Sequence, residues 1–571
     1  MPIRKEVLYI ILAVIITFVV YYDSFNNSFI WDDFSFIVNN KAIRNLDIKG
    51  VISYFTDRDT SSNSKGLSAD IYRPLVTTSF AIDYRLWGLN PRLYHIENTA
   101  LHLFNVLLVF ILAQLIFSSS EAAFIASLIF GIHPVQTEAV TWIAGRSNVL
   151  FLFFYLAALI THIKASRKSG FGFALILFTL GLFAKEMAIT LPIVMLLCDL
   201  RFSRRQGIGE YIEYYTPFFT VLLFYLAARW SVSGGLAQGT EYWGSTLSEN
   251  SMVMLKAIAG YMRLLILPIN LRADYVINIP ESLFSQDMAI AFGAMAVVAG
   301  AYASLRRDRP ASFFILWFFV TLAPVYNIVP FKAIMAERFL YPASIGFSCL
   351  AALILTRLRA VAPKTAVVSL CGLIIFYGAG TLARNVDWRN EIYLYTQDLV
   401  KSPESARFHY NLGFAYCREH LVGPFKEKDP KKRLEYYAHA EDEFRATLRL
   451  RPDHADSHFY LGNVYSDLGL YDKAIGCFKK ALSLEPNAGI YNNLGIVYYN
   501  RGEYNKAIEC YKNALALNWD TPQLGYLNLG NAYLKKKEFA KARRIWEAVL
   551  KLDPTNQAIE ANIKDLKKAG F

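Results

Sequence analysis

Two adjacent carboxylates, Asp32 and Asp33, lie in the segment FIWDDFSFIVNN, shortly after the first apolar stretch of the chain, residues 7–22. An apolar environment raises the pKa of a carboxyl group into a range that suits it to accept a proton from an attacking hydroxyl. Because neighbouring residues project in different directions, we expect one carboxylate to react and the other to organise the site. Capping of the following helix is the structural alternative.

Four further links between apolar runs contain charged or polar residues. Those that would support the reacting carboxylate are Glu97, His133, Glu138, Glu186 and Glu337. The cations that would bind an anion are Arg146, Lys185 and Arg338. Arginine suits this role because its planar fork can donate two hydrogen bonds to a phosphate. Helix-end contacts, local ion pairs and interfacial anchoring are the alternatives for these residues.

Cofactor motifs are largely missing from the sequence. It contains no HExxH or H-x-H arrangement that would indicate zinc. It also lacks a P-loop, a glycine-rich dinucleotide loop and a G-x-S-x-G motif, so no soluble nucleotide cofactor is expected. Two adjacent carboxylates are able to hold Mg²⁺ or Mn²⁺ through an irregular turn, so a divalent metal at Asp32 and Asp33 stays an open alternative.

The elements that must position these residues are membrane helices. Hydrophobic residues make up 54% of the 571-residue chain, which is typical of a polytopic membrane protein. We predict a helical membrane domain over residues 1–385, although some of its apolar runs are shorter than the ~20 residues of a usual span. The eleven predicted spans are 7–22, 99–117, 122–140, 148–163, 171–184, 187–199, 214–230, 287–304, 311–328, 340–357 and 365–382.

Basic residues predict the orientation of this domain. They gather in alternate links, at residues 4–5, 164–168, 201–205, 306–309 and 357–364. The opposite short links contain Arg146, Lys185, Lys332 and Arg338. Since basic clusters favour the cytoplasmic side, the N-terminus is predicted to be cytoplasmic, and the candidate site and C-terminal region periplasmic or ER-lumenal. This assignment requires segment 252–268 to lie in the interface or re-enter. Topology thus accounts for the net charge of +12, and no nucleic acid is expected as a partner.

The C-terminal region, residues 390–571, repeats with a period near 34 residues. YLGNVYSDLGLYDKAIGCFKKALSLEP at 460–486 returns at 493–518 and 528–554, and an earlier copy at 409–452 is spread by an insertion around 421–435. The order L-G-x-x-Y, Ala, aromatic residue and Pro resembles the tetratricopeptide repeat (TPR). Four copies predict an α-solenoid with a concave peptide-binding face, which makes the whole chain all-α.

Carboxylates and cations at the external face of a membrane suit glycosyl transfer from a lipid-linked sugar. A carboxylate would accept the proton of an acceptor hydroxyl as the hydroxyl attacks the anomeric carbon. Arginine and lysine would stabilise the departing lipid phosphate. Such a donor requires no ATP, which agrees with an external site. The expected partners are a polyprenyl-phosphate-linked sugar, membrane lipids and an acceptor protein or peptide held by the repeats.

The whole chain resembles the transmembrane and TPR-repeat containing O-mannosyltransferases of the GT-C superfamily. The segments that carry the resemblance are FIWDDFSFIVNN, YRPLVTTSFAIDYRLWGLNPRLYHIENTALHLFNVLLVF, GIHPVQTEAVTWIAGRSNVL, AKEMAITLPIVMLLCDL, PINLRADYVI and MAERFLYPASIGF, followed by the repeats. The resemblance implies a GT-C fold, a polyprenyl-phosphate mannose or similar hexose donor, and inversion at the anomeric carbon. It also implies that Asp32 or Asp33 supplies the catalytic carboxylate, and that Arg338 binds phosphate.

Two other functions compete with this interpretation. The first is a membrane-anchored TPR scaffold, which has no need for buried carboxylates in five links. The second is a transporter of lipid-linked saccharides, which would favour charged residues deep within the spans, whereas here they gather near one face.

Overall fold

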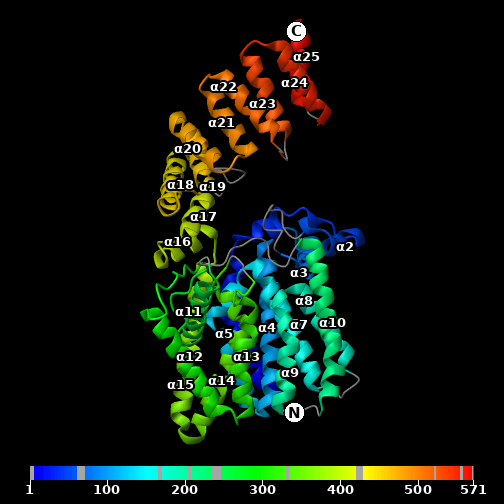
Figure 1. Ribbon diagram of the computed structural model, residues 1–571, viewed down its shortest axis with the longest axis vertical. Helices are drawn as coiled ribbons and strands as arrows, with labels where there is room; N and C mark the ends of the chain where they lie inside the picture. Colours follow the sequence, from blue (N-terminus) through cyan, green and yellow to red (C-terminus); the bar gives the residue numbers. More distant parts are fainter. Residues whose placement is uncertain are drawn as a thin grey trace. The chain divides into compact units, whose positions relative to one another are not determined.

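The structure, a computed structural model, describes residues 5–60, 71–164, 170–202, 207–234, 246–329, 333–418, 429–517, 519, 522–552, 557–568 and 570 (Figure 1). These residues form helices and no strands, which confirms the predicted all-α class. The chain divides into two compact units, Met1–Lys401 and Ser402–Phe571. The sequence prediction starts the repeat domain at residue 390, whereas α16 (Glu391–Lys401) lies in the first unit.

The first unit is a bundle of helices. Its long helices are α1 (Lys5–Tyr21), α4 (Pro91–Phe117), α5 (Ser120–Ile132), α7 (Arg146–Lys164), α8 (Phe171–Ala184), α9 (Leu191–Phe202), α10 (Ile208–Ser233), α11 (Leu247–Ile266), α12 (Gln286–Leu305), α13 (Arg309–Leu322), α14 (Leu340–Val361) and α15 (Pro363–Asp387). All eleven predicted spans contain helix. Among the described residues, six helices are long and apolar enough to cross a membrane, or seven if a bent pair counts as one span. The count of eleven stays a prediction, and α11, which covers the segment predicted to lie in the interface, is not among the six.

The predicted span at 122–140 is broken rather than straight. Helix α5 ends at Ile132, and the chain continues after a 54° bend through Pro134–Gln136 into α6 (Thr137–Val140). The break follows from Pro134, because proline disfavours helical geometry in the residue before it. His133 accordingly takes extended angles, φ −70° and ψ 129°. The short helix α6 carries Glu138, so the break positions one of the predicted site residues.

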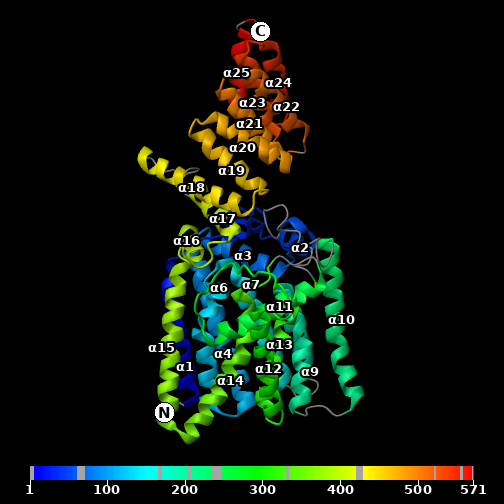
Figure 2. The same ribbon diagram turned by 60° about the vertical axis from the view of Figure 1, so that its left-hand side comes forward.

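Short elements gather at the end of the bundle opposite the N-terminus (Figures 1 and 2). They include the π-helix Phe34–Val38, α2 (Ile48–Thr56), α3 (Pro74–Trp87), α6, and the 3₁₀ turns Ile143–Gly145, Glu186–Thr190 and Glu337–Phe339. Figure 2 shows α1 and α15 side by side below this end. All the predicted site residues lie on or next to these short elements, except Glu97, which lies in the first two turns of α4.

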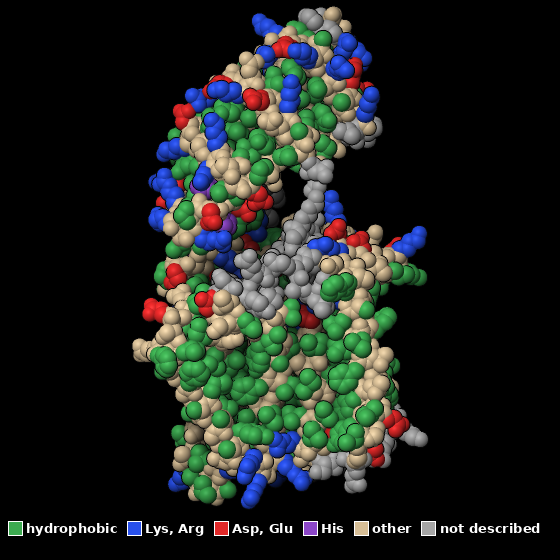
Figure 3. All heavy atoms as spheres, viewed as in Figure 1, with side chains coloured by type: hydrophobic (Ala, Val, Ile, Leu, Met, Phe, Trp, Pro, Cys, Tyr) green, Lys and Arg blue, Asp and Glu red, His purple; other side chains and the backbone are tan. Residues whose placement is uncertain are grey.

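The surface of the first unit agrees with a membrane location. Figure 3 shows a broad belt of hydrophobic side chains, with Lys and Arg side chains gathered at its lower edge. Among the described basic residues are Lys164, Arg201 and Arg306, whereas Arg4, Lys332 and segments 165–169 and 203–206 lie outside the described residues. The orientation of the unit in a membrane stays a prediction.

The second unit is built from helix pairs. The described helices are α17 (Ala406–Tyr416), α18 (Pro430–Leu450), α19 (Ala455–Asp467), α20 (Tyr471–Leu484), α21 (Ala488–Asn500), α22 (Tyr504–Ala516), α23 (Pro522–Lys535), α24 (Phe539–Leu552) and α25 (Gln557–Lys568). Residues 419–428, which cover most of the predicted insertion, lie outside the described residues. The repeated glycine and aromatic residue meet inside each pair, as Gly462 does with Phe478 and Gly495 with Tyr511.

Gly462→Val is expected to destabilise the repeat unit by about 1–3 kcal/mol, since added carbon forces packed neighbours apart. A Cβ at Gly462 would lie 2.7 Å from a ring carbon of Phe478. Gly476 on α20 is the matched control, because a Cβ there would meet nothing within 4 Å. Gly476→Ala should leave stability unchanged or raise it by up to about 1 kcal/mol through helix propensity. Thermal unfolding of both variants measures the difference, and equal melting temperatures would contradict the packing argument.

Candidate functional site

The acidic loop, defined here as residues 27–40, is held by contacts at both ends. The Nδ2 of Asn27 donates to the carbonyl of Asn385 at 3.3 Å, and its own carbonyl lies 3.1 Å from Nε2 of His95. At the other end, the Nδ2 of Asn40 donates to the carbonyl of Thr60 at 3.1 Å. These buried anchors to distant elements fix the loop, so that its carboxylates have defined positions.

The structure gives Asp33 and Asp32 different surroundings. Asp33 is fully buried, and its Oδ1 accepts from the Ala144 N–H at 2.7 Å while Oδ2 accepts from the Ile30 N–H at 3.0 Å. Burial raises the pKa of Asp33 well above its usual value, the two backbone hydrogen bonds oppose this rise, and the nearby carboxylates of Asp32 and Glu391 add to it. Asp32 is only partly buried. Asp33 therefore ties the acidic loop to residue 144, and Asp32 is the carboxylate nearer to solvent.

A stack of indoles links the acidic loop to Arg338. Trp31 has a left-handed φ of 52°, and its ring stacks on Trp142 with centroids 5.2 Å apart. The guanidinium of Arg338 lies 5.7 Å from the Trp142 ring centroid. Its backbone N–H donates to Oε2 of the fully buried Glu138 at 2.7 Å, and its Nη1 pairs with the other oxygen. Glu138 thus orients Arg338, whose side chain is 20% exposed and remains accessible.

A cationic cluster, defined here as Arg73, Lys185, Glu186 and Arg229, lies beside this pair. Arg73 holds Glu186 in a two-pronged pair, with N–O distances of 2.8 and 3.2 Å. Arg229 approaches the same carboxylate at 3.9 Å. Two guanidinium groups thus share one carboxylate, so the cluster carries an excess of positive charge that suits it to bind an anion.

Lys185 joins the cationic cluster to Arg338. It is 2% exposed, donates to Oδ1 of Asn148, and lies 5.6 Å from the ring centroid of Phe339, the residue after Arg338. Burial lowers its pKa well below the usual lysine value, and the neighbouring charges of Arg73 and Arg338 lower it further. An incoming phosphate would favour the charged form of this amine.

An apolar cavity of about 270 Å³ lies between α8 and α10, lined by Thr179, Leu182, Phe183, Thr220, Val221, Phe224 and Tyr225. Tyr225 connects this cavity with the cationic cluster. Its ring packs against Phe183, with centroids 5.9 Å apart, and it lies one helical turn before Arg229 on α10. An apolar cavity near the cationic cluster suits a ligand with a hydrocarbon chain and a charged head.

Arg146 is placed differently from its predicted role. Its side chain is fully buried, and Nη1 pairs with Asp83 at 2.8 Å while Nη2 lies 3.6 Å from Glu97. Burial raises the pKa of Asp83 to about 7, although Arg146 opposes the rise and Glu97 adds to it. These contacts fasten α3 and α4 to the start of α7. Arg146 is thus a bracing residue in this structure, and Glu97 is its 40%-exposed partner.

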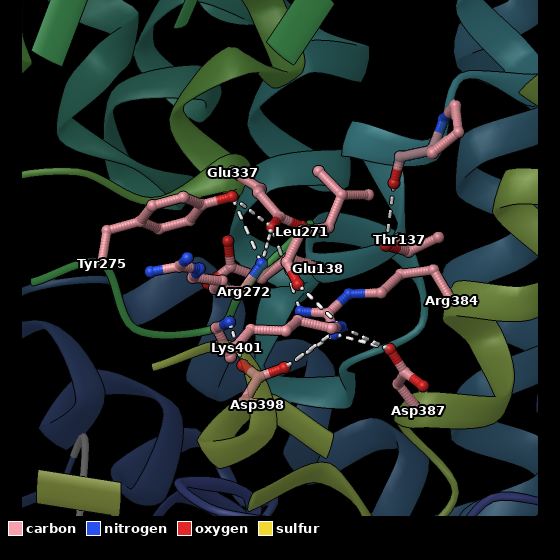
Figure 4. A network of polar contacts seen from close by, with 12 residues as sticks. Thr137, Glu138, Leu271, Arg272, Tyr275, Glu337, Arg384, Asp387, Asp398 and Lys401 are labelled. Carbon is pink, nitrogen blue, oxygen red and sulfur yellow. Dashed lines mark hydrogen bonds and ion pairs between the residues drawn. The ribbon is translucent and has the colours of Figure 1, made fainter. Parts of the chain in front are cut away.

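His133 and Glu337 also hold backbone segments together. Nε2 of the buried His133 lies 2.9 Å from the carbonyl of Leu265. Oε1 of the buried Glu337 accepts from the Arg272 N–H at 2.6 Å and from the Tyr275 hydroxyl at 2.7 Å. Figure 4 shows the surrounding network, in which Arg384 reaches Asp398 at 2.9 Å and Glu337 at 3.9 Å. This network anchors the segment that carries Arg338.

The structure therefore brings together part of the predicted set. Glu138, Lys185, Glu186 and Arg338 lie together, and the stack of Trp31 on Trp142 joins the acidic loop to Arg338. Arg146, Glu97, His133 and Glu337 instead hold the surrounding segments. The sequence prediction omits Arg73 and Arg229. Arg73 stands in the segment YRPLVTT directly before the proline that begins α3, and Arg229 is the last but one residue of the apolar run 214–230. Both positions indicate the boundary of a helix rather than a site.

The acidic loop offers a poor donor set for a metal. Both oxygens of Asp33 accept hydrogen bonds from backbone N–H groups. Within the described part of the chain, no three His, Cys, Asp or Glu side chains are grouped closely enough to hold a metal ion. Divalent cations prefer several oxygen ligands, so the residues present do not fit Mg²⁺ or Mn²⁺ at Asp32 and Asp33.

Comparison with known proteins bears on the interpretation of both units. The tetratricopeptide repeat family matches residues 455–488, 488–518 and 523–556. The chain is 29% identical over 421 residues to Protein O-mannosyl-transferase F38B6.6 of Caenorhabditis elegans, which covers 71% of this chain and 59% of the relative. It is 25% identical over 511 residues to Protein O-mannosyl-transferase TMTC3 of Mus musculus and of Homo sapiens, covering 82% of this chain and 54% of each relative.

These relatives confirm the resemblance to TPR-containing O-mannosyltransferases. The chain spans 54–59% of the length of these curated relatives. Among solved structures, the crystal structure of MamA protein is 21% identical, with a TM-score of 0.25, and the match covers 29% of this chain and 83% of that one.

Proposed function

We propose that this chain is a membrane protein O-mannosyltransferase that transfers mannose or a similar hexose from a polyprenyl-phosphate donor to a serine or threonine hydroxyl. The observation that carries the proposal is the junction of the acidic loop and the cationic cluster through Trp142, Glu138 and Arg338. This junction offers a proton acceptor and an anion site in one region. The names of the relatives support the reaction class.

Asp32 is the base in this mechanism. Its carboxylate accepts the proton of the acceptor hydroxyl while the hydroxyl oxygen forms a bond to the anomeric carbon. The bond between that carbon and the phosphate oxygen breaks, and its electron pair leaves with the lipid phosphate. Attack from the face opposite the phosphate inverts the anomeric centre. Asp33 positions Asp32 through its two backbone hydrogen bonds.

The departing phosphate binds to Arg338, Arg73 and Arg229, with Lys185 behind them. Charge develops on the leaving oxygen in the transition state, and preorganised cations stabilise it more strongly there than in the ground state. The hydrocarbon chain of the donor enters the cavity between α8 and α10, which is lined by Tyr225, one helical turn before Arg229 on α10. We place this site on the external side of the membrane, as the basic clusters predict.

Arg73→Met is expected to weaken the donor phosphate contact, and so to lower kcat/KM for the lipid-linked sugar by about 10²–10³-fold. The apolar side chain of methionine preserves much of the volume of arginine, so a lower kcat/KM measures the effect of removing the positive charge. Arg263→Met is the matched control, because Arg263 on α11 is exposed and outside the site. Initial rates at varied donor concentration measure the effect, and equal kcat/KM in the two variants would remove Arg73 from the phosphate site.

The proposed function is tested with the purified chain in detergent. Polyprenyl-phosphate mannose and a serine- and threonine-containing peptide are the substrates, and mass spectrometry detects a peptide heavier by one hexose. Parallel reactions with polyprenyl-phosphate glucose and with EDTA test the sugar and the need for a divalent metal. Product formation that depends on Asp32 supports the proposal. No product from either donor, with protein that remains folded, would favour the scaffold.

A further inference from the structure

Helix α16 begins with a buried carboxylate that contacts the acidic loop. Glu391, its first residue, is 3% exposed, and its Oε1 accepts from the Trp31 N–H at 2.5 Å. Two residues earlier, the carbonyl of Arg389 accepts from the Ser28 N–H at 3.0 Å. The segment that enters α16 therefore holds the acidic loop at two points, although Glu391 and Trp31 lie 360 residues apart in the chain.

The side chain of Trp31 is held as well. Its ring stacks on Trp142 with centroids 5.2 Å apart, and Trp142 stacks in turn on the fully buried Trp388 with centroids 6.3 Å apart. Stacked aromatic rings stabilise one another beyond the burial of their surface. Trp31 is thus fixed by its ring and, through its backbone N–H, by Glu391, so that its backbone has one defined conformation.

The conformation that results is one that tryptophan rarely adopts. The φ of Trp31, 52°, lies in the left-handed region, which is unfavourable for a bulky residue and persists where surrounding contacts hold it. The chain turns at this point, since the next carbonyl, that of Asp32, accepts from the N–H groups of Ser35 and Phe36 at 3.0 and 2.9 Å. The direction of the Asp32 side chain consequently depends on the backbone angles of Trp31.

Capping of α16 does not explain the position of Glu391. Asn390 caps this helix, because its Oδ1 accepts from the Tyr393 N–H at 2.8 Å and its carbonyl accepts from the Leu394 N–H at 3.0 Å. The carboxylate of Glu391 instead accepts from an N–H in a distant segment. Burial of a carboxylate is costly unless hydrogen bonds compensate for it, so this contact requires an explanation beyond the stability of α16.

We propose that Glu391 is a positioning residue for the sugar transfer. Its carboxylate holds Trp31 in the left-handed conformation, and this conformation directs the carboxylate of Asp32 toward the acceptor hydroxyl. Asp33 holds the acidic loop on the C-terminal side of Asp32, and Glu391 holds it on the N-terminal side. The contact between Glu391 and Trp31 is independent of the reaction, whereas its effect on transfer rests on the proposed function, in which Asp32 is the base.

Two substitutions of Glu391 separate the reach of its side chain from its charge. Glu391→Asp keeps the charge but withdraws the oxygen by about 1.5 Å, beyond hydrogen-bond distance from the Trp31 N–H. We expect it to lower kcat for sugar transfer by about 10²-fold, because a misplacement of about 1 Å has an effect of this size. Glu391→Gln keeps an accepting oxygen at full reach, and kcat should stay within about tenfold of wild type, since a neutral acceptor forms a weaker hydrogen bond.

The donor KM separates positioning from a general loosening of the first unit. It should stay within about threefold of wild type in both variants, because the cations that bind the donor phosphate are unchanged. A general loosening would instead raise this KM while kcat falls. Thermal unfolding shows whether each variant is folded at the assay temperature. Glu404→Ala is the matched control, since this exposed carboxylate follows α16 closely in the chain, and it should leave kcat and KM unchanged.

Hydrogen exchange of the acidic loop tests the contact without any sugar donor. In wild type, the Trp31 N–H should exchange at least about tenfold more slowly than in Glu391→Asp, since a charge-assisted hydrogen bond protects it. The Glu391→Gln variant should retain most of this protection. The N–H of Asn39, which donates to the carbonyl of Phe34 at 2.8 Å, is the internal reference and should be unaffected. Fragmentation of the deuterated peptides by mass spectrometry resolves the two amides.

Three results would overturn the proposal. They are a folded Glu391→Asp variant with the kcat of wild type, a Glu391→Gln variant as slow as Glu391→Asp, and a Trp31 N–H that exchanges equally fast in all three proteins. If the wild-type chain transfers no sugar while its Trp31 N–H is protected relative to Glu391→Asp, the proposed function fails and the contact of Glu391 with the acidic loop is confirmed. Failure of the positioning contact and failure of the transferase are therefore distinguished.

Discussion

Asp32→Asn is expected to slow sugar transfer by about 10²–10⁴-fold, the usual contribution of a positioned general base. Asparagine has nearly the same size and cannot accept the proton of the acceptor hydroxyl. Because Asp32 is only partly buried, the substitution should leave folding nearly unchanged. Single-turnover rates with saturating donor measure the chemical step, and donor affinity should stay within a few-fold of wild type.

The matching substitution at Asp33 has a different expected signature. Its two oxygens accept from Ile30 and Ala144, so an asparagine nitrogen would face one of these N–H groups. Leaving a buried donor without an acceptor costs about 1–3 kcal/mol, so Asp33→Asn should lower the melting temperature. Two results together would reverse the roles assigned to the two carboxylates. They are full transfer activity in the Asp32→Asn variant, and loss of activity in an Asp33→Asn variant that is as stable as wild type.

Arg146→Met should destabilise the first unit by about 3–5 kcal/mol, because it leaves the buried Asp83 without its charged partner. Arg146 and Asp83 have side chains 0% and 2% exposed and lie 2.8 Å apart. A residue that bound the donor phosphate would instead change the KM for the donor with little loss of stability. Thermal unfolding and donor titration of the same variant therefore separate the two roles.

The pH dependence gives a second test of the Arg146 pair. Without Arg146, the carboxyl of Asp83 keeps only the influences that raise its pKa, namely burial and the neighbouring Glu97. A carboxyl whose folded pKa lies above its unfolded value favours folding at low pH, and this contribution is lost as the pH rises through the folded pKa. The folded pKa of Asp83 is already about 7 in wild type, so both proteins lose stability alike below that pH, and Arg146→Met should melt at progressively lower temperature relative to wild type as the pH rises above about 7.

A double variant is the control. Arg146→Met with Asp83→Leu removes both charges and should recover most of the stability, since buried pairs replaced by apolar residues are often neutral. A single variant that melts like wild type at every pH would show that Arg146 does not brace the helices.

Patterns that repeat over short distances could be interpreted from the sequence alone. The helical class, the repeat region and the apolar segments follow from periodicity and composition, because these patterns depend on residues that are close together in the sequence. The packing of the repeated glycine against the repeated aromatic residue could also be predicted from the sequence, and Gly462 and Phe478 are in contact as the repeat pattern predicts. The choice of Asp32 and Asp33 as candidates also came from local context, two charges among apolar residues.

The division of labour among the charged residues is decided only by the tertiary structure. Asp33 accepts a hydrogen bond from the N–H of Ala144, which lies 111 residues away in the chain, and so this carboxylate holds backbone segments together. Arg146 is equally prominent in the sequence, but Asp83 and Glu97 neutralise it. Arg73 and Arg229 stand at boundaries and meet at Glu186 only when α3, α8 and α10 pack together. Whether a charged residue braces the fold or faces the site depends on which oppositely charged or hydrogen-bonding group packs against it. These groups lie far away along the chain, so only the tertiary structure identifies them.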